Sequence, residues 1–179
     1  KRFKIQSENI KNYVNKVIGN STTTISSRDA YFGPSAFVDM IHSIQLEITG
    51  ADISFAAPLS IDVKINTGPV KVADMFKLYR FENMLYTMNL TGEEIHKYLE
   101  YSCSEWLNTM KGPGDFLLRL RVGKDGKPIL NNGRAWLKNQ PYNFDSAAGI
   151  DYVVDVSKPD GKRVCIKSLS NGHSFEYLK

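Results

Sequence analysis

The chain has 179 residues and a formal net charge of +4, and its 42% hydrophobic and 23% charged residues are typical of a globular domain. No apolar run is long enough to span a bilayer, and the lysines and arginines are scattered rather than clustered. The sequence therefore indicates neither a membrane span nor a nucleic-acid polymer as partner.

The first part of the chain alternates between expected helices and short extended segments. Apolar residues at helical spacing predict an amphipathic helix over Ile5 to Ile18. Thr22 to Ser27 is either a strand or an extended connector. Gly33 and Pro34 suit a helix start, and the following pattern predicts a helix from Pro34 to Leu46. Ala51 to Ala57 is typical of a short buried strand.

The central stretch carries the clearest local signals. Apolar and polar residues alternate from Met84 to Leu90, which predicts a strand. Thr91 followed by Glu94 is a capping box, so a helix begins there. The apolar stripe of that helix is expected at Ile95, Tyr98, Leu99, Ser102, Cys103 and Trp106.

The last part of the chain favours strands. Leu118 to Val122 alternates apolar residues with Arg119 and Arg121, as in a half-exposed strand whose arginines face solvent. A β-branched run from Ile150 to Val156 and a second run from Arg163 to Leu169 flank a turn at Pro159 to Lys162, which predicts a hairpin. Together the elements indicate one mixed α/β unit.

Motifs for stand-alone catalysis are missing from the sequence. It contains no His-Glu-x-x-His, no Walker-type glycine loop and no Gly-x-Ser-x-Gly. We interpret His42 and His96 as surface or core-edge residues rather than metal ligands. For Cys103 and Cys165 we expect buried, weakly polar thiols, with a single disulfide as the alternative.

Two places suggest binding. Phe81 lies at the junction between an expected helix and an expected strand, where it is either a plug under the helix or a stacking platform for a flat ligand. Asn83 would add a polar contact to such a platform. Asp145 is either a cap of a helix or turn, or a carboxylate that accepts hydrogen bonds from sugar hydroxyls.

In order and spacing, several segments between Ser26 and Leu169 resemble the C-terminal domain of the 5′-nucleotidase family, closest to its 2′,3′-cyclic-nucleotide 2′-phosphodiesterase/3′-nucleotidase branch. The resemblance implies an α/β fold, a mixed sheet with flanking helices, truncated at its C-terminal end. It also implies a linker helix at 1–20 and an incomplete substrate-binding domain at 21–179. The segments that carry it are Tyr31-Phe32, Ala51 to Pro58, Leu78 to Leu85, Thr91 to Glu94, Leu99-Glu100, Tyr142 to Asp145, Gly149 to Tyr152, and Asp155.

In that family the C-terminal domain binds the nucleoside and an N-terminal metallophosphoesterase domain holds two divalent metal ions. The resemblance therefore implies Phe81, Asn83, Phe144 and Asp145 as substrate-binding residues, with no catalytic or metal-binding residue in this chain. Asp62 stands where the 5′-nucleotidase branch has a substrate-binding arginine, so that contact is not expected. In the family, the base lies between two aromatic rings. The residue that supplies the second ring is expected beyond Lys179.

The expected function follows from the resemblance. The parent protein would be a periplasmic or secreted phosphoric ester hydrolase acting on nucleotides, with the N-terminal domain as its partner. This fragment would bind a nucleoside or nucleotide, be inactive by itself and hold no cofactor. The alternative is a non-enzymatic protein-interaction domain that retains the fold, for which the Asp62 departure and solvent-facing arginines would be evidence.

Overall fold

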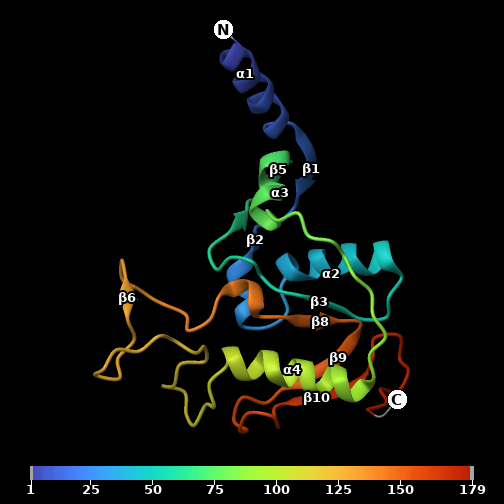
Figure 1. The fold of residues 1–179 in the computed structure, drawn as a ribbon, viewed down its shortest axis with the longest axis vertical. Helices are drawn as coiled ribbons and strands as arrows, with labels where there is room; N and C mark the ends of the chain where they lie inside the picture. The colour runs from blue at the N-terminus through green and yellow to red at the C-terminus, as the bar shows by residue number, and fades with distance from the viewer. Residues whose placement is uncertain (1, 178–179) are drawn as a thin grey trace. The chain divides into compact units, whose positions relative to one another are not determined.

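The structure is a computed structural model that describes residues 2–177 (Figure 1). Its backbone divides into two compact units, the first formed by residues 1–40 and 58–85 and the second by residues 41–57 and 86–179. Each unit mixes helices with short strands, and the strands of the described residues pair as five two-stranded sheets. The expected α/β class is confirmed. No helix within residues 2–177 is both long and apolar enough to cross a bilayer.

The first unit is built from short antiparallel strand pairs. Strand β1 pairs with β5, and β2 pairs with β4. The 3₁₀ helix η1 follows β2, helix α2 begins in this unit and continues into the second, and α3 follows β5 directly. The bounds are α1 Arg2–Val14, β1 Val17–Ser21, β2 Ile25–Ser26, η1 Ser27–Tyr31, α2 Ala36–Thr49, β4 Lys64–Ile65, β5 Gly68–Lys71 and α3 Val72–Leu78.

Two boundaries expected in this unit are corrected. The first helix ends at Val14, and Val17 and Ile18 belong to β1 instead. Their β-branched side chains favour a strand, and Val17 pairs with Lys71 across the sheet. Pairing between distant segments therefore overrides the local helical spacing. The second helix runs from Ala36 to Thr49, slightly later than expected.

The second unit contains a helix of 15 residues and several short strands. The bounds are β3 Ser54–Ala56, α4 Gly92–Trp106, β6 Leu130–Asn131, β7 Arg134–Ala135, η2 Pro141–Asn143, β8 Ser146–Ala148, β9 Ile150–Val154 and β10 Val164–Leu169. Strand β3 pairs antiparallel with β8, and β9 with β10. The expected strand at Leu118 to Val122 is reduced to isolated bridges at Leu118, Leu120 and Val122.

Helix α4 begins as its sequence predicts. The Glu94 amide donates to Oγ1 of Thr91 at 3.2 Å, and Oε2 of Glu94 accepts from the Thr91 amide at 2.8 Å, which confirms the capping box. The expected apolar stripe is buried except for Tyr98, which is partly exposed. Its buried members are Ile95, Leu99, Ser102, Cys103 and Trp106.

The hairpin of β9 and β10 is confirmed, and side chains occupy the outer edge of β10. The Val164 amide donates to Oε1 of Glu100 at 2.7 Å, while Nε2 of His96 donates to the Val164 carbonyl at 2.9 Å. The hydroxyl of Tyr177 accepts from the Ile166 amide and donates to the Ile166 carbonyl, both at 3.1 Å. The alternation of β10 also buries Val164 and Ile166 and exposes Cys165.

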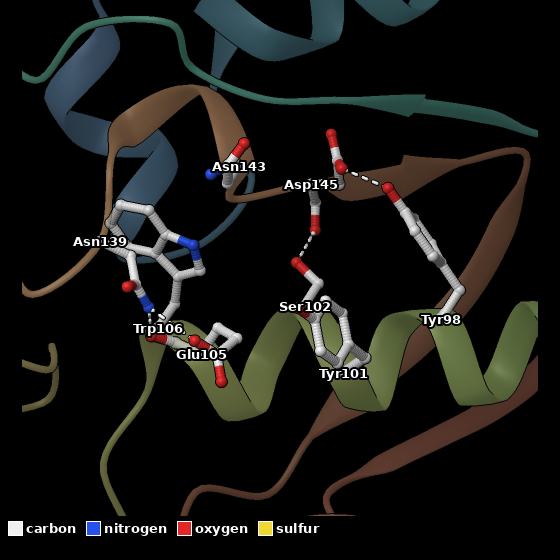
Figure 2. Close-up of a pocket in the computed structure, with 8 residues that line it drawn as sticks. All are labelled: Tyr98, Tyr101, Ser102, Glu105, Trp106, Asn139, Asn143 and Asp145. Carbon is white, nitrogen blue, oxygen red and sulfur yellow. Dashed lines mark hydrogen bonds between the residues drawn. The ribbon is translucent and has the colours of Figure 1, made fainter.

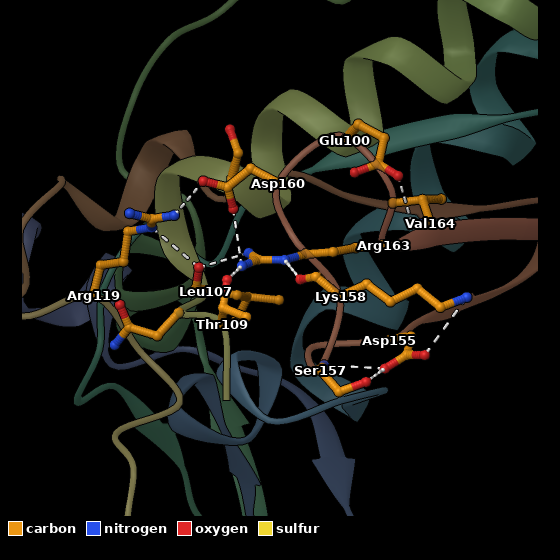
Figure 3. A network of polar contacts seen from close by, with 12 residues as sticks. Glu100, Leu107, Thr109, Arg119, Asp155, Ser157, Lys158, Asp160, Arg163 and Val164 are labelled. Carbon is orange, nitrogen blue, oxygen red and sulfur yellow. Dashed lines mark hydrogen bonds and ion pairs between the residues drawn. The ribbon is translucent and has the colours of Figure 1, made fainter. Parts of the chain in front are cut away.

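A buried arginine ties this hairpin to the end of α4 (Figure 3). Arg163 is 1% exposed, and its guanidinium donates to the Leu107 carbonyl at 2.7 Å, to Oγ1 of Thr109 at 2.6 Å and to the Lys158 carbonyl at 3.0 Å. It also pairs with Asp160 at 2.9 Å. This connection holds the loop after α4 against the turn of the hairpin.

Arg119 belongs to the same cluster. It pairs with Asp160 at 2.7 Å and donates from Nε to the Leu107 carbonyl at 3.1 Å. The expectation that Arg119 faces solvent is therefore wrong, because a nearby carboxylate and carbonyl engage its guanidinium. Arg121 is exposed, as expected, and its guanidinium lies 5.1 Å from the ring centre of Trp136.

The expected strand from Met84 to Leu90 does not form within the described residues. All seven residues are exposed, and the described backbone gives them no strand partner. Exposure reaches 77% at Met84 and 71% at Met88. Alternating polarity predicts an extended chain, but a strand also needs a neighbour to pair with, and the described residues supply none.

Candidate functional site

Phe81 presents an aromatic ring to solvent. Helix α3 ends at Leu78, and the chain then continues without helix or strand as far as α4. Phe81 is 46% exposed, and the guanidinium of Arg80 lies 5.6 Å from its ring centre. A plug under the helix would be buried, so the exposure of Phe81 argues against the plug. Stacking of Phe81 on a flat ligand stays a prediction.

Asn83 is held close to the same segment. Its Nδ2 donates to the Tyr79 hydroxyl at 2.8 Å. Among the residues that the structure describes, Oδ1 of Asn83 accepts no hydrogen bond. The amide is therefore oriented from one end and keeps an acceptor for a ligand that carries N–H groups.

A cavity of about 310 Å³ lies in the second unit, between α4 and the segment from Asn139 to Asp145 (Figure 2). One helical face supplies its floor, because residues spaced three and four apart share a face of a helix. The lining residues are Tyr98, Tyr101, Ser102, Glu105, Trp106, Asn139, Asn143 and Asp145.

Asp145 is fixed at the wall of this cavity. Its Oδ2 accepts a short hydrogen bond from the Tyr98 hydroxyl, and its carbonyl accepts from Oγ of Ser102 at 2.8 Å. Burial raises the pKa of the Asp145 carboxyl, which the Tyr98 hydrogen bond partly offsets. The pKa of Tyr98 is also raised, chiefly by burial and then by its bond to Asp145. The raised pKa of Tyr98 keeps its hydroxyl protonated, and therefore able to donate to Asp145, at neutral pH.

Phe144 lies inside rather than at the surface. Its exposure is 9%, and its ring centre lies 5.0 Å from that of Trp106 at an interplanar angle of 34°. Such a pair stabilises the wall of the cavity from behind. A direct contact between Phe144 and a nucleoside stays a prediction.

The four expected substrate-binding residues divide between the units. Phe81 and Asn83 belong to the first unit, and Phe144 and Asp145 to the second. That all four contact one substrate stays a prediction. Sequence reasoning missed Glu105 as a cavity residue, although its position three residues after Ser102 would have placed both on one helical face.

The described histidines are not arranged as metal ligands. His42 is 2% exposed, and its ring nitrogens lie 2.9 Å from Oγ of Ser54 and 3.1 Å from Oγ of Ser146. The expected surface or core-edge position of His42 is therefore wrong, because the two hydroxyls satisfy its ring inside the core. Within residues 2–177, no three His, Cys, Asp or Glu side chains converge as a metal site would require.

The cysteines show one expected and one unexpected environment. Both are free thiols. Cys103 is buried as expected, and burial raises its pKa to about 12. Cys165 is exposed, contrary to expectation, because it occupies an outward position of β10 between the buried Val164 and Ile166.

Comparison with known proteins decides the family. The sequence profile described as "5′-nucleotidase, C-terminal domain" matches residues 17–175. The chain belongs to this family. Among curated proteins, this 5′-nucleotidase C-terminal domain is 30% identical over 97 residues to the trifunctional nucleotide phosphoesterase protein YfkN of Bacillus subtilis. That match covers 53% of the chain and 6% of YfkN.

Solved structures share the fold of the domain. A putative 5′-nucleotidase from Staphylococcus aureus, in complex with alpha-ketoglutarate, matches 96% of the chain with a TM-score of 0.68 and 17% identity. A 5′-nucleotidase precursor from Thermus thermophilus matches 97% with the same TM-score and 20% identity. The domain spans 31% and 30% of those two chains, respectively. The expected fold, that of a 5′-nucleotidase C-terminal domain, is thus confirmed.

Proposed function

We propose that the chain is the nucleoside-binding specificity domain of a two-metal nucleotide phosphohydrolase, of the 5′-nucleotidase or 2′,3′-cyclic phosphodiesterase/3′-nucleotidase type. The observation that carries the proposal is the exposed Phe81 ring, followed two residues later in the chain by the oriented amide of Asn83. Membership of the 5′-nucleotidase C-terminal domain family supports the same assignment.

The chemistry of the segment suits a nucleobase. An aromatic ring that stacks on a base contributes about 1–3 kcal/mol, whichever base is bound. The side-chain nitrogen of Asn83 donates to the Tyr79 hydroxyl, so its side-chain oxygen can accept from an exocyclic amine or ring N–H of a base. Phe81 would thus supply affinity, and Asn83 would supply selectivity for bases that donate there.

Catalysis is assigned to another part of the parent protein. The described residues do not fit a pair of divalent metal ions, so we derive no catalytic step from this chain. When bound, such ions supply Lewis-acid activation of water for attack on a phosphate ester. We propose that a metallophosphoesterase domain of the same protein holds them, with residues 1–20 as the link and residues 21–179 as the substrate-binding domain.

We also propose that the parent protein works in the periplasm or outside the cell. The relative from Thermus thermophilus is described as a precursor, which agrees with a protein that is processed during export. The match to that relative covers 97% of this chain.

Binding of adenosine and AMP to the chain tests the proposal. Amide chemical shifts are followed by NMR during titration of the wild type and of Phe81→Ala. Removal of the ring is expected to weaken binding about 5- to 150-fold, because stacking contributes about 1–3 kcal/mol. Asn83→Asp is expected to change the preference among bases more than the average affinity.

Phe32 offers a matched control. It is also an exposed phenylalanine, and the guanidinium of Arg28 lies 6.0 Å from its ring centre. Phe32→Ala is expected to leave adenosine binding unchanged. Equal binding by the wild type and Phe81→Ala would remove Phe81 from the site and contradict the proposal.

A protein-interaction domain is the second candidate, and the exposed apolar segment from Met84 to Leu90 favours it. An extended segment of this kind is suited to pairing with a strand of a partner. A parent protein that hydrolyses no nucleotide in the presence of divalent metal, and binds none, would support this function instead.

A further inference from the structure

Two carboxylates border the cavity above α4, and each is positioned through one oxygen only. Oδ2 of Asp145 accepts from the Tyr98 hydroxyl, and Oε2 of Glu105 accepts from Nδ2 of Asn139 at 2.9 Å (Figure 2). Within the described part of the chain, Oδ1 of Asp145 and Oε1 of Glu105 accept no hydrogen bond. The cavity is thus bordered by two oriented acceptors that lack donors.

The charge of the lining is uncompensated. The eight lining residues include Asp145 and Glu105 but no lysine, arginine or histidine. A carboxylate in a partly desolvated wall is stabilised by a cation within a few ångströms. The raised pKa of Asp145 agrees with such an environment, because its burial is not offset by a positive group.

Aromatic side chains complete the lining. Tyr98 and Tyr101 project from the same face of α4, and Tyr101 is 66% exposed at the cavity. The face of an aromatic ring attracts an ammonium group. The cavity therefore offers two carboxylate acceptors and two aromatic rings to a cationic ligand.

We propose that this cavity binds a small aliphatic diamine, whose two ammonium groups pair with Asp145 and Glu105 and whose methylene chain lies against the tyrosine rings. The volume, about 310 Å³, is at the small end of the range for ligand sites and fits a ligand of this size. A sugar also donates hydrogen bonds, but it is neutral and leaves both charges uncompensated. The site is independent of Phe81, which does not line the cavity.

Calorimetric titration of the chain with putrescine at neutral pH tests the proposal. The wild type is expected to bind it saturably and more weakly as salt is added. Glu105→Gln is expected to lower the affinity at least about tenfold, because a charge-assisted hydrogen bond is lost. Tyr101→Ala is expected to lower it about two- to fivefold through the lost aromatic face. Tyr101 is mostly exposed, so the second variant probes the site without disturbing the core.

Glu93→Gln is the matched control. Glu93 also lies on α4, but it pairs with Lys97 at 2.6 Å and does not line the cavity. It is expected to bind putrescine as the wild type does. Butanediol, the neutral analogue, is expected not to bind.

Four results would overturn the proposal. They are absence of saturable putrescine binding, equal binding of butanediol, an equal loss in Glu93→Gln and Glu105→Gln, and binding of ribose in place of the diamine. The last result would instead support a sugar-binding role for Asp145. Phe81→Ala is expected to leave putrescine binding unchanged, so this test is separate from that of nucleoside binding.

Discussion

Replacement of Arg163 by methionine tests the buried connection between α4 and the hairpin. Methionine keeps the length of the aliphatic stem but removes hydrogen bonds to the Leu107 carbonyl, the Lys158 carbonyl and Thr109. At about 1 kcal/mol net for each bond, the loss is about 3 kcal/mol. The ion pair with Asp160 adds less than about 1 kcal/mol, because the Asp160 side chain is 48% exposed and screened by water.

Urea unfolding followed by circular dichroism measures this loss. Asp160→Asn is the control, since it removes only the exposed side of the network, and its expected cost is below about 1 kcal/mol. The midpoint for Arg163→Met should therefore fall well below that for Asp160→Asn. If the two variants unfold at the same urea concentration, the buried hydrogen bonds do not stabilise the domain as argued.

Three further predictions concern single positions. Burial raises the pKa of Asp145 above its ordinary 3.8, so its contribution to stability is present below that value and is lost as pH rises through the folded pKa. When unfolding is measured at several pH values from acidic to neutral, Asp145→Asn should become more stable relative to the wild type as the pH rises; a constant difference in stability would contradict this. Cys165 should react quickly with a thiol reagent, whereas Cys103, with its pKa near 12, should react only on unfolding; equal rates in the folded chain would be inconsistent with this burial. Gly149→Ala should destabilise by at least about 2 kcal/mol in urea unfolding, because φ is +90° and the added Cβ would lie 2.0 Å from the Asp52 carbonyl oxygen; wild-type stability would refute the close approach.

Local rules predicted the parts of the fold that depend on neighbours in sequence. Thr91 and Glu94 fixed the start of α4, and the turn at Pro159 to Lys162 marked the hairpin of β9 and β10. These signals act within a few residues, so they can be recognised without knowledge of the rest of the chain.

The sequence-based predictions were wrong where a segment distant in the sequence determines the local structure. Val17 and Ile18 fit a helical stripe, but pairing with β5 draws them into β1. The segment from Met84 to Leu90 has the alternation of a strand but no described neighbour. His42 is satisfied by serines on β3 and β8, a long-range arrangement that no local pattern shows.

The candidate site was predicted in part. The resemblance singled out Phe81 and Asn83, and the structure adds the exposure of the ring and the bond that orients the amide. Asp145 was singled out as well. Its donor Tyr98 and the second lining carboxylate, Glu105, were not, because contacts from α4 to the segment after Asn139 depend on tertiary packing.

The side chains along the outer edge of β10 have a consequence for how the domain behaves at high concentration. An open strand edge offers unpaired amides and carbonyls on which another chain can form a strand, and this is a common start of aggregation. Here the backbone amides and carbonyls of Val164 and Ile166 form hydrogen bonds with the side chains of Glu100, His96 and Tyr177. The three side chains replace a neighbouring strand, so this edge is closed to intermolecular growth while α4 stays in place.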